Sequence, residues 1–311
     1  MTSAEKNLRN QLHEQFVAYG TNAKMWMRKC ALLLPEIEQR RVWDRGEFRS
    51  IYEYAAKLAG MSRDAVNDAL RILGKVEDMP EIIEVIKLKG INAVKPIENV
   101  VTVESAKFWA AKVRIMSKNT LETYVKEMRK TDDVGLPRKL GNGEFTQEKA
   151  VLDFLGLHEA KIVGMELAPE VFEKLEKLKG DGSWNELMKT LLEEREQRLA
   201  EQKPAAVEAT ARTIPAKIKK FVIQRTNGTC AFPGCLKPNQ ILHHTQRLVL
   251  EKVHDPDRIV GLCKAHERLA HLGLIENEDG PAVGWRVRRE PDATSPKYAV
   301  DVVVNKFRHG V

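Results

Sequence analysis

Apolar residues recur at helical spacing through residues 1–130, which predicts a mostly helical N-terminal region. Residues 50–73, SIYEYAAKLAGMSRDAVNDALRIL, predict a helix, a turn at Gly60-Met61-Ser62, and a second helix that Ser62 caps. This layout is typical both of a DNA-binding helix-turn-helix and of an ordinary helical hairpin. In the first case, the outward residues of the second helix that contact DNA are expected to be Arg63, Asn67 and Arg71.

The middle of the chain predicts a strand and two helices between two linkers. Residues 131–157 are rich in Gly, Asp and Lys, and residues 201–212 in Ala, Pro and Glu, as linkers are. Residues 158–200 alternate like a strand over KIVGMEL and then predict two helices, PEVFEKLEKLKG and SWNELMKTLLEEREQRL. This order resembles the ribbon-helix-helix modules that pair as dimers. A homodimer is therefore one expectation, and a plain packing hairpin is the other.

Short strands, turns and helices follow each other in the C-terminal part. Within residues 213–280, a basic helix (IPAKIKKFVIQR) precedes a tight turn (GTCAFPGC), two strands (QILHH and RIVGL) and a helix (CKAHERLAH) that Gly273 ends. In residues 281–311, GWRVRRE and KYAVDVVVNKF alternate like two strands, which predicts a β-hairpin tail. The expected fold class is α+β, with the helices mainly in the N-terminal region.

The composition fits this class and argues against others. Hydrophobic residues make up 43% and charged residues 31% of the chain, as in soluble helical proteins, whereas 6% aromatic residues are too few for a large sandwich or barrel. No apolar run approaches the ~20 residues of a membrane span. The polar opening MTSAEKNLRNQLHEQF lacks the apolar block of a secretory signal. We expect a cytoplasmic protein with no membrane partner.

Basic residues are concentrated in one part of the chain. The net charge is +7, and residues 209–250 contain no acidic residue. Such a run is usually a solvated surface, but beside candidate metal ligands it favours contact with nucleic-acid phosphates. Its basic residues are Arg212, Lys217, Lys219, Lys220, Arg225, Lys237 and Arg247.

Three of the four cysteines lie close together, whereas Cys30 stands alone in a helical segment and is expected to be a buried apolar residue. Clustered cysteines in a cytosolic protein favour a metal over disulfides. Cys230 and Cys235 flank a Pro-Gly turn, and Cys263 and His266 project about 60° apart from the start of a helix. Because neither pair can close a structural site alone, the four residues together predict a structural Zn²⁺ ion.

A second polar group is predicted beside the zinc ligands. Glu267 and His271 are four residues apart on the same helix, so they share a face next to the zinc-binding face. His243 and His244 are consecutive in a strand, so their side chains point to opposite faces. One of the two histidines can therefore meet the face that carries Glu267 and His271.

The stretch CAFPGC…ILHHTQR…DPDRIVGLCKAHERLAH resembles the HNH endonuclease family, and this resemblance covers residues 213–275. It implies a ββα-metal fold with a bracing zinc, in which a hairpin and a helix surround one divalent ion. It implies that His244 is the general base that takes a proton from the attacking water. It also implies that His243 and His271 bind a catalytic Mg²⁺, Mn²⁺ or Ni²⁺ ion. Glu267 stands where the family often has histidine, and a carboxylate also binds such ions.

One position departs from the family pattern. Five residues before Cys263, the family usually has an asparagine that braces the loop of the base, and this chain has Arg258. Arginine cannot accept a hydrogen bond in its place. Either Arg258 contacts the phosphate, or Arg247 and His254 take over part of the bracing role, or the site is impaired.

Two functions fit these features. The first is a metal-dependent endonuclease that hydrolyses DNA phosphodiester bonds, with Arg247 and Arg258 at the phosphate and double-stranded DNA as the expected partner. The second is a non-catalytic, zinc-containing DNA-binding or regulatory protein, which Arg258, Glu267 and the helix-turn-helix layout favour. RNA as the substrate stays open. In either case the surface residues expected to hold nucleic acid are Lys217, Lys219, Lys220 and Arg225, with Arg63, Asn67 and Arg71.

Overall fold

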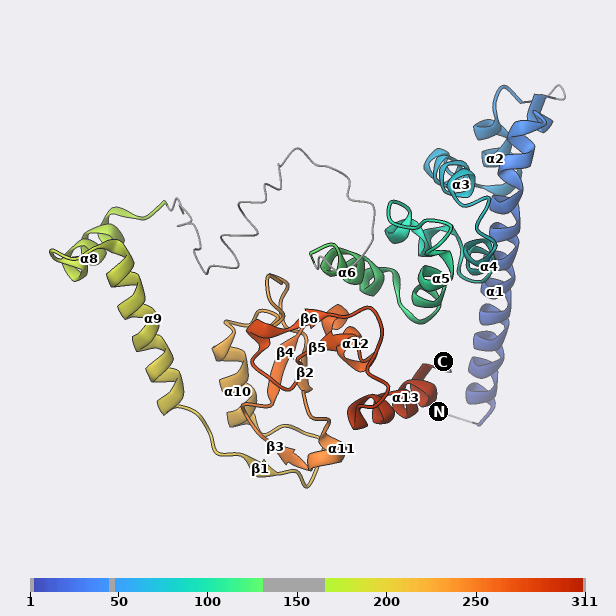
Figure 1. The fold of residues 1–311 in the computed structure, drawn as a ribbon. Helices are drawn as coiled ribbons and strands as arrows, with labels where there is room; N and C mark the ends of the chain where they lie inside the picture. The colour runs from blue at the N-terminus through green and yellow to red at the C-terminus, as the bar shows by residue number, and fades with distance from the viewer. Residues whose placement is uncertain (1–2, 45–47, 131–165, 310–311) are drawn as a thin grey trace. The chain divides into compact units, whose positions relative to one another are not determined.

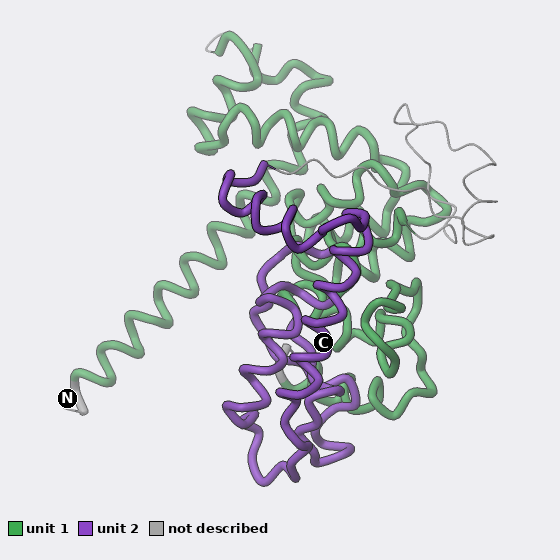
Figure 2. The backbone as a smooth tube through the Cα atoms, turned by 90° about the vertical axis from the view of Figure 1, so that its left-hand side faces the viewer, with its two compact units in different colours: residues 1–136, 232–234, 262–311 green, residues 137–231, 235–261 purple. Residues whose placement is uncertain are grey.

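The computed structural model describes residues 3–44, 48–130 and 166–309 (Figure 1). Helices dominate, and the strands form three two-stranded sheets, so the predicted α+β class is confirmed. The chain forms two compact units, which Figure 2 colours separately. Unit 1 contains residues 1–136, 232–234 and 262–311, and unit 2 contains residues 137–231 and 235–261.

Two predictions for the middle of the chain cannot be followed in the structure. The predicted linker 131–157 and residues 158–165, which include most of the predicted strand KIVGMEL, lie outside the described residues. None of the helices within the described ranges has the length and apolar composition needed to cross a membrane. The cytoplasmic location stays a prediction.

The N-terminal region of unit 1 is helical, as predicted. α2 and α3 have the expected layout, because Gly60 adopts a left-handed φ of 64° and the Ser62 hydroxyl accepts a hydrogen bond from the Ala65 amide at 3.2 Å. The elements are α1 (Ser3–Gln39), η1 (Val42–Asp44), α2 (Ile51–Ala59), α3 (Arg63–Lys75), α4 (Pro80–Lys89), η2 (Ile91–Ala93), η3 (Lys95–Ile97), α5 (Ala106–Ile115) and α6 (Lys118–Met128).

Two apolar contacts organise these helices. Ala31 and Leu34, near the end of α1, are buried in one cluster with Val66 and Ala69 of α3. This burial fixes the last turns of α1 against α3. A second contact involves the fully buried Tyr124 of α6, whose ring lies 6.2 Å from the Trp109 ring in edge-to-face geometry.

The last part of unit 1 packs on α6. The hydroxyl of Tyr124 lies 3.2 and 3.1 Å from the carbonyl oxygens of Arg288 and Arg289, so a buried hydroxyl finds its partners in this segment. β5 and β6 are antiparallel, with Ile275 opposite Val287. The elements of this part are α12 (Lys264–His271), β5 (Ile275–Glu276), η4 (Ala282–Gly284), β6 (Arg286–Val287) and α13 (Pro296–His309).

The prediction of a β-hairpin tail at 281–311 is wrong in its second half. β6 is a strand, but KYAVDVVVNKF lies in α13. The valines of this segment favour a strand locally. The contacts of α13 instead have helical spacing: Tyr298 packs against Gly273, Asp301 bonds to the His271 ring, and Asn305 bonds to the His271 carbonyl. Tertiary packing therefore outweighs the local preference for a strand.

Unit 2 contains the predicted helix pair of the middle segment and most of the predicted C-terminal motif. Ser183 and Glu186 form a capping box at the start of α9. β1 lies inside the predicted linker 201–212 and pairs antiparallel with β3, with Val207 opposite His254. The elements are α8 (Pro169–Lys179), α9 (Trp184–Glu201), β1 (Val207–Glu208), α10 (Ala216–Arg225), β2 (Ile241–His244), α11 (Leu248–Glu251), β3 (Val253–His254) and β4 (Ile259–Leu262).

A small core holds α10 against the β2–β4 sheet. Ile218, Phe221 and Val222 of α10 are buried in one cluster with Ile259 of β4. The sheet also depends on a close approach at Gly261, where a Cβ atom would lie 2.5 Å from Nδ2 of Asn239. Only glycine leaves room for this contact. β4 runs directly into α12, so the predicted strand, strand and helix follow one another as expected.

Candidate functional site

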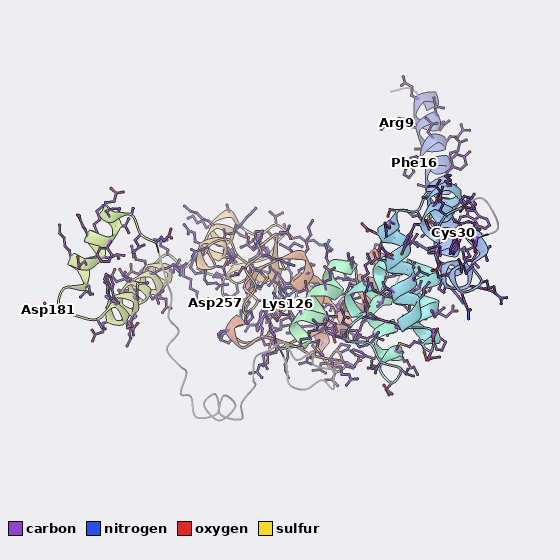
Figure 3. The ribbon with its side chains drawn as sticks, turned by 90° about the horizontal axis from the view of Figure 1, so that it is seen from above. Arg9, Phe16, Cys30, Lys126, Asp181 and Asp257 are labelled. Carbon is purple, nitrogen blue, oxygen red and sulfur yellow. The ribbon has the colours of Figure 1, made fainter. Side chains whose placement is uncertain are left out.

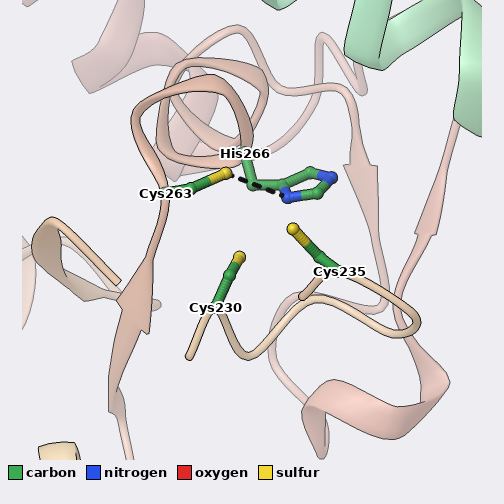
Figure 4. A group of neighbouring side chains, drawn as sticks. All are labelled: Cys230, Cys235, Cys263 and His266. Carbon is green, nitrogen blue, oxygen red and sulfur yellow. Dashed lines mark hydrogen bonds between the residues drawn. The ribbon is translucent and has the colours of Figure 1, made fainter. Parts of the chain in front are cut away.

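Three cysteines and one histidine come together in a single group (Figure 4). Cys230 and Cys235 lie on the loop between α10 and β2, whereas Cys263 and His266 lie at the start of α12. The sulfur and nitrogen atoms of the four side chains all lie within 4.8 Å of one another. The sequence prediction that these residues form one group able to hold a metal ion is confirmed.

The local structure explains how each pair of ligands is positioned. Gly234 has a left-handed φ of 69°, which lets the chain reverse between the two cysteines. The Cys230 amide donates a hydrogen bond of 2.8 Å to the Lys237 carbonyl and closes this loop. The His266 ring stacks on Phe232, with ring centroids 4.0 Å apart and planes 10° apart, so its orientation is fixed by packing.

The donor set of this group fits zinc. Tetrahedral zinc, with bonds of about 2.3 Å to sulfur and about 2.0 Å to nitrogen, keeps neighbouring ligand atoms roughly 3.3–3.8 Å apart. Cys263 Sγ and His266 Nδ1 are 3.4 Å apart, within that range. Across residues 3–44, 48–130 and 166–309, no second group of three or more Cys, His, Asp or Glu side chains converges in the same way.

His243 is buried and lies against Arg247. Arg247 Nη1 donates to His243 Nε2 at 3.1 Å, and it also lies 3.3 and 3.2 Å from the carbonyl oxygens of His244 and Thr245. Arg247 is itself buried and has a left-handed φ of 57°, so it braces the turn that follows β2. The predicted roles of Arg247 at phosphate and of His243 as a metal ligand stay predictions.

His244 takes part in a short chain of hydrogen bonds. Its Nε2 lies 3.0 Å from His254 Nδ1, and His254 Nε2 lies 3.0 Å from the Ala211 carbonyl oxygen. A carbonyl only accepts, so His254 Nε2 carries a hydrogen, and in the neutral ring His254 Nδ1 is then an acceptor. His244 Nε2 must therefore donate. In neutral His244 the lone pair is left on Nδ1.

Burial keeps His244 uncharged at neutral pH. The pKa of His244 is lowered from 6.5 to about 4, first by loss of hydration in its half-buried position and then by the nearby rings of His254 and His243. The protein thus holds an imidazole in its neutral form, with the hydrogen on a defined nitrogen. This is the state that a general base requires before it takes up a proton.

Glu267 and His271 lie together, as their spacing predicts. His271 Nε2 is 3.3 Å from Glu267 Oε1, and His271 Nδ1 is 2.6 Å from Asp301 Oδ1 of α13. Asp301 is buried, so its carboxylate fixes the orientation of the His271 ring. Metal-binding histidines commonly have a carboxylate on the nitrogen that does not bind the metal. Binding of a divalent ion by Glu267 and His271 stays a prediction.

Two predicted phosphate contacts are engaged with other groups of the protein. Arg258 is exposed and pairs with Glu251 and, at 3.8 Å, with Asp255. Arg225 donates hydrogen bonds of 3.1 and 2.7 Å to the carbonyl oxygens of Pro256 and Ile259, and burial lowers its pKa. Arg225 therefore braces the start of β4, whereas Arg258 would have to exchange its carboxylates for a phosphate.

The remaining predicted DNA contacts lie on the surface. On α10 the exposed residues are Lys217, Lys219 and Lys220, and on α3 they are Arg63, Asn67 and Arg71. Tyr52 donates a hydrogen bond of 2.8 Å to Asn67, and Arg63 stacks over the Tyr52 ring. These contacts orient the outer face of α3. Binding of DNA by either helix stays a prediction.

Sequence reasoning missed Asp301 and the Ala211 carbonyl, and it named His254 only as an alternative brace. Asp301 lies in a segment predicted to be a strand, and Ala211 lies in a predicted linker, so neither had a pattern that connected it to the histidines. A helical assignment of residues 296–309 would have placed Tyr298, Asp301 and Asn305 on one face.

Family models, curated proteins and solved structures were compared with the chain, and none of them matches it.

Proposed function

We propose that the chain is a zinc-braced, metal-dependent endonuclease of the HNH type that hydrolyses phosphodiester bonds of DNA. The observation that carries this proposal is the state of His244, a neutral imidazole whose Nε2 hydrogen is committed to His254 and whose Nδ1 keeps its lone pair. The hydrogen bond to His254 also serves a structural histidine, whereas the lone pair left on Nδ1 is what a base for water needs.

In the proposed reaction, His244 Nδ1 takes a proton from water as the water oxygen attacks phosphorus and the bond to the leaving nucleotide oxygen breaks. The protonated ring is then stabilised through its Nε2–H bond to His254, which is anchored on the Ala211 carbonyl. The negative charge of a bound phosphate raises the pKa of His244 from its low value in the free protein, and the divalent ion at that phosphate acts in the opposite direction.

The proposed reaction needs two metal sites. The group Cys230, Cys235, Cys263 and His266 would hold the structural zinc. Glu267 and His271 are the donors proposed for the catalytic ion, with Asp301 orienting the His271 ring, although these side chains do not form a second converging group among the described residues. When bound, such an ion polarises the phosphate and stabilises the charge on the leaving oxygen.

Cleavage of supercoiled plasmid tests the proposal. The zinc-loaded parent protein is expected to produce nicked circles with Mg²⁺, Mn²⁺ or Ni²⁺, and chelation should stop the reaction. His244→Gln should lower the rate by about a hundredfold or more, since a general base contributes at least that much. His13→Gln, which changes an exposed histidine of α1, is the control and should cleave like the parent. Absence of metal-dependent nicking by the parent would contradict the proposal.

A second candidate is a DNA-binding protein that does not cleave. The pairing of Arg258 with Glu251 and Asp255 favours it, because it leaves carboxylates where the family has its asparagine brace. This candidate predicts a gel shift with double-stranded DNA that His244→Gln does not change, and no nicking with any of the three metals. The plasmid assay therefore separates the two functions.

A further inference from the structure

The first part of α1 lacks the burial that its last turns have. Ala31 and Leu34 are buried against α3, but residues 5–19 and 21–27 are exposed (Figures 2 and 3). In Figure 2 this part extends away from the other helices of unit 1, and Figure 3 labels Phe16 on it. Most of the stability of a helix in a protein comes from the packing of an apolar face.

The apolar residues of α1 follow a heptad pattern. From Leu12 onward, one set of apolar residues is separated by steps that alternate between four and three residues, which is the 3.5-residue period of a coiled-coil seam; Val17, Ala18, Met25 and Met27 lie outside this set. At ~100° per residue, this seam lies about a quarter turn from the face of Ala31 and Leu34. It is exposed at Leu12, Phe16, Tyr19, Ala23, Trp26 and Leu33, whereas Cys30 and Ile37, which continue the period, pack against the core cluster that contains Ala31 and Leu34. The part of the seam from Leu12 to Trp26 lies outside this core.

The exposed seam carries large aromatic rings and few charges beside it. Phe16 is 79%, Tyr19 70% and Trp26 58% exposed. Between residues 10 and 27 the charged side chains are Glu14 and Lys24. A surface helix of a monomeric protein normally has a charged outer face, and a continuous aromatic stripe of this kind marks an interaction site.

We infer that this seam is the dimer interface of the protein, where α1 of one chain packs against α1 of a second copy in a coiled coil. A heptad seam is complementary to itself, because its side chains enter the spaces of another helix with the same period. The positions that flank the seam from Leu12 to Trp26 are His13, Gln15, Gly20 and Asn22, with Met27 after it, so the formal charge beside the seam begins at Lys29, which lies over the Trp26 ring.

The surface area that the seam can bury is consistent with a second copy of α1 as its partner. Aromatic side chains bury about 150–250 Å² each, so three of them with the neighbouring leucines approach the ~800 Å² per partner of a stable interface. The inference goes beyond the proposed nuclease activity and does not depend on it. It also assigns the dimer contact to α1 and not to the α8–α9 segment for which the sequence suggested pairing.

Sedimentation velocity of the full-length, zinc-loaded chain tests the inference. The parent is expected to be a dimer at about 50 µM, and Phe16→Glu should raise its dissociation constant about thirtyfold or more, because a buried aromatic at the centre of an interface is replaced by a charge. Val17→Glu is the matched control. Val17 is the next residue of the same helix and is 50% exposed, but it lies off the seam. This variant should dimerise like the parent.

Leu12→Glu provides a second seam variant, and an unchanged far-ultraviolet circular dichroism spectrum shows that each variant is folded. A monomeric parent at this concentration would overturn the inference. Equal dissociation by Phe16→Glu and Val17→Glu would also overturn it, because the effect would then not be specific to the seam. A dimer that Leu192→Glu in α9 dissociates and Phe16→Glu does not would place the contact in the α8–α9 segment.

Discussion

The Cys/His group and the histidines of β2 use the same kinds of side chain in opposite ways. In the first, the ligand atoms of Cys230, Cys235, Cys263 and His266 lie within 4.8 Å of one another and form a group able to hold a metal ion. In the second, the nitrogens meet protein groups: His243 meets Arg247, and His244 meets His254. The first region is able to hold a metal ion, whereas the second keeps an imidazole neutral and oriented.

The largest effect on folding is expected from disrupting the Cys/His group. Cys263→Ser removes a buried ligand, and structural zinc contributes on the order of 10 kcal/mol to the folding of small zinc domains. We expect loss of zinc and loss of protease resistance around residues 225–275, while α2–α6 stay folded. Metal analysis and limited proteolysis of the full chain measure both effects. Cys30→Ser, outside the group, should retain one zinc per chain, and retention of zinc by Cys263→Ser would contradict the assignment.

The second prediction concerns His254, the hydrogen-bond partner of His244. His254→Phe abolishes the acceptor for His244 Nε2–H, so the tautomer of His244 is no longer fixed. The rate of plasmid nicking should fall about ten- to a hundredfold, as is typical when a group that orients a functional histidine is lost. His254→Gln, which can still donate to the Ala211 carbonyl, should retain more activity. Equal activity of parent and His254→Phe would show that His254 has no positioning role.

A smaller effect is expected at His271. Like the Cys/His group it is a predicted metal ligand, and like His243 and His244 its ring nitrogens contact other side chains of the protein. Asp301→Asn weakens the bond that orients the His271 ring, and the affinity for Mn²⁺ should fall about tenfold. Electron paramagnetic resonance of the zinc-loaded protein titrated with Mn²⁺ measures this affinity. Asn305→Ala removes a neighbouring α13 contact, to the His271 carbonyl, and should leave the affinity unchanged.

Two outcomes of the same titration would contradict this prediction. If the parent binds Mn²⁺ and both variants bind it equally well, Asp301 is a structural residue of the α12–α13 contact. If the parent binds no Mn²⁺, the catalytic ion itself is contradicted, and with it the proposed hydrolysis.

The smallest predicted effect is on stability as a function of pH. The pKa of His244 is about 4 when folded and about 6.5 when unfolded, so the unfolded chain binds more protons between these values and stability falls as the pH decreases from 7 to 4. Because the ring is half-exposed, the contribution is on the order of 1 kcal/mol. Urea unfolding at pH 7.5 and 5.5 should show a steeper pH dependence for the parent than for His244→Gln. Equal slopes would show that burial does not lower the pKa of His244.

Local spacing allowed much of the structure to be predicted. The Cys230–Cys235 and Cys263–His266 pairs each depend on a turn or a helix start that the sequence itself encodes, so the metal group was predictable. The Gly60-Met61-Ser62 turn between α2 and α3 was predictable for the same reason.

The features that were predicted wrongly or missed depend on contacts between residues that are far apart in the sequence. The valines of α13 favour a strand, and the helix is explained by Tyr298 and Asp301 packing on Gly273 and His271. His254 acquires its role because β1 pairs with β3 and brings the Ala211 carbonyl to its ring. The Arg247 side chain turns inward to His243, although a basic residue beside a histidine pair suggests contact with phosphate.

The protonation state of His244 is the most direct test of the central claim. A two-bond ¹H–¹⁵N spectrum of the zinc-loaded protein at pH 7 should show His244 protonated at Nε2 and unprotonated at Nδ1, and a titration should give a pKa of about 4. A hydrogen on Nδ1, or a pKa close to the ordinary 6.5, would contradict the account, because the protein would then not hold this imidazole as a base.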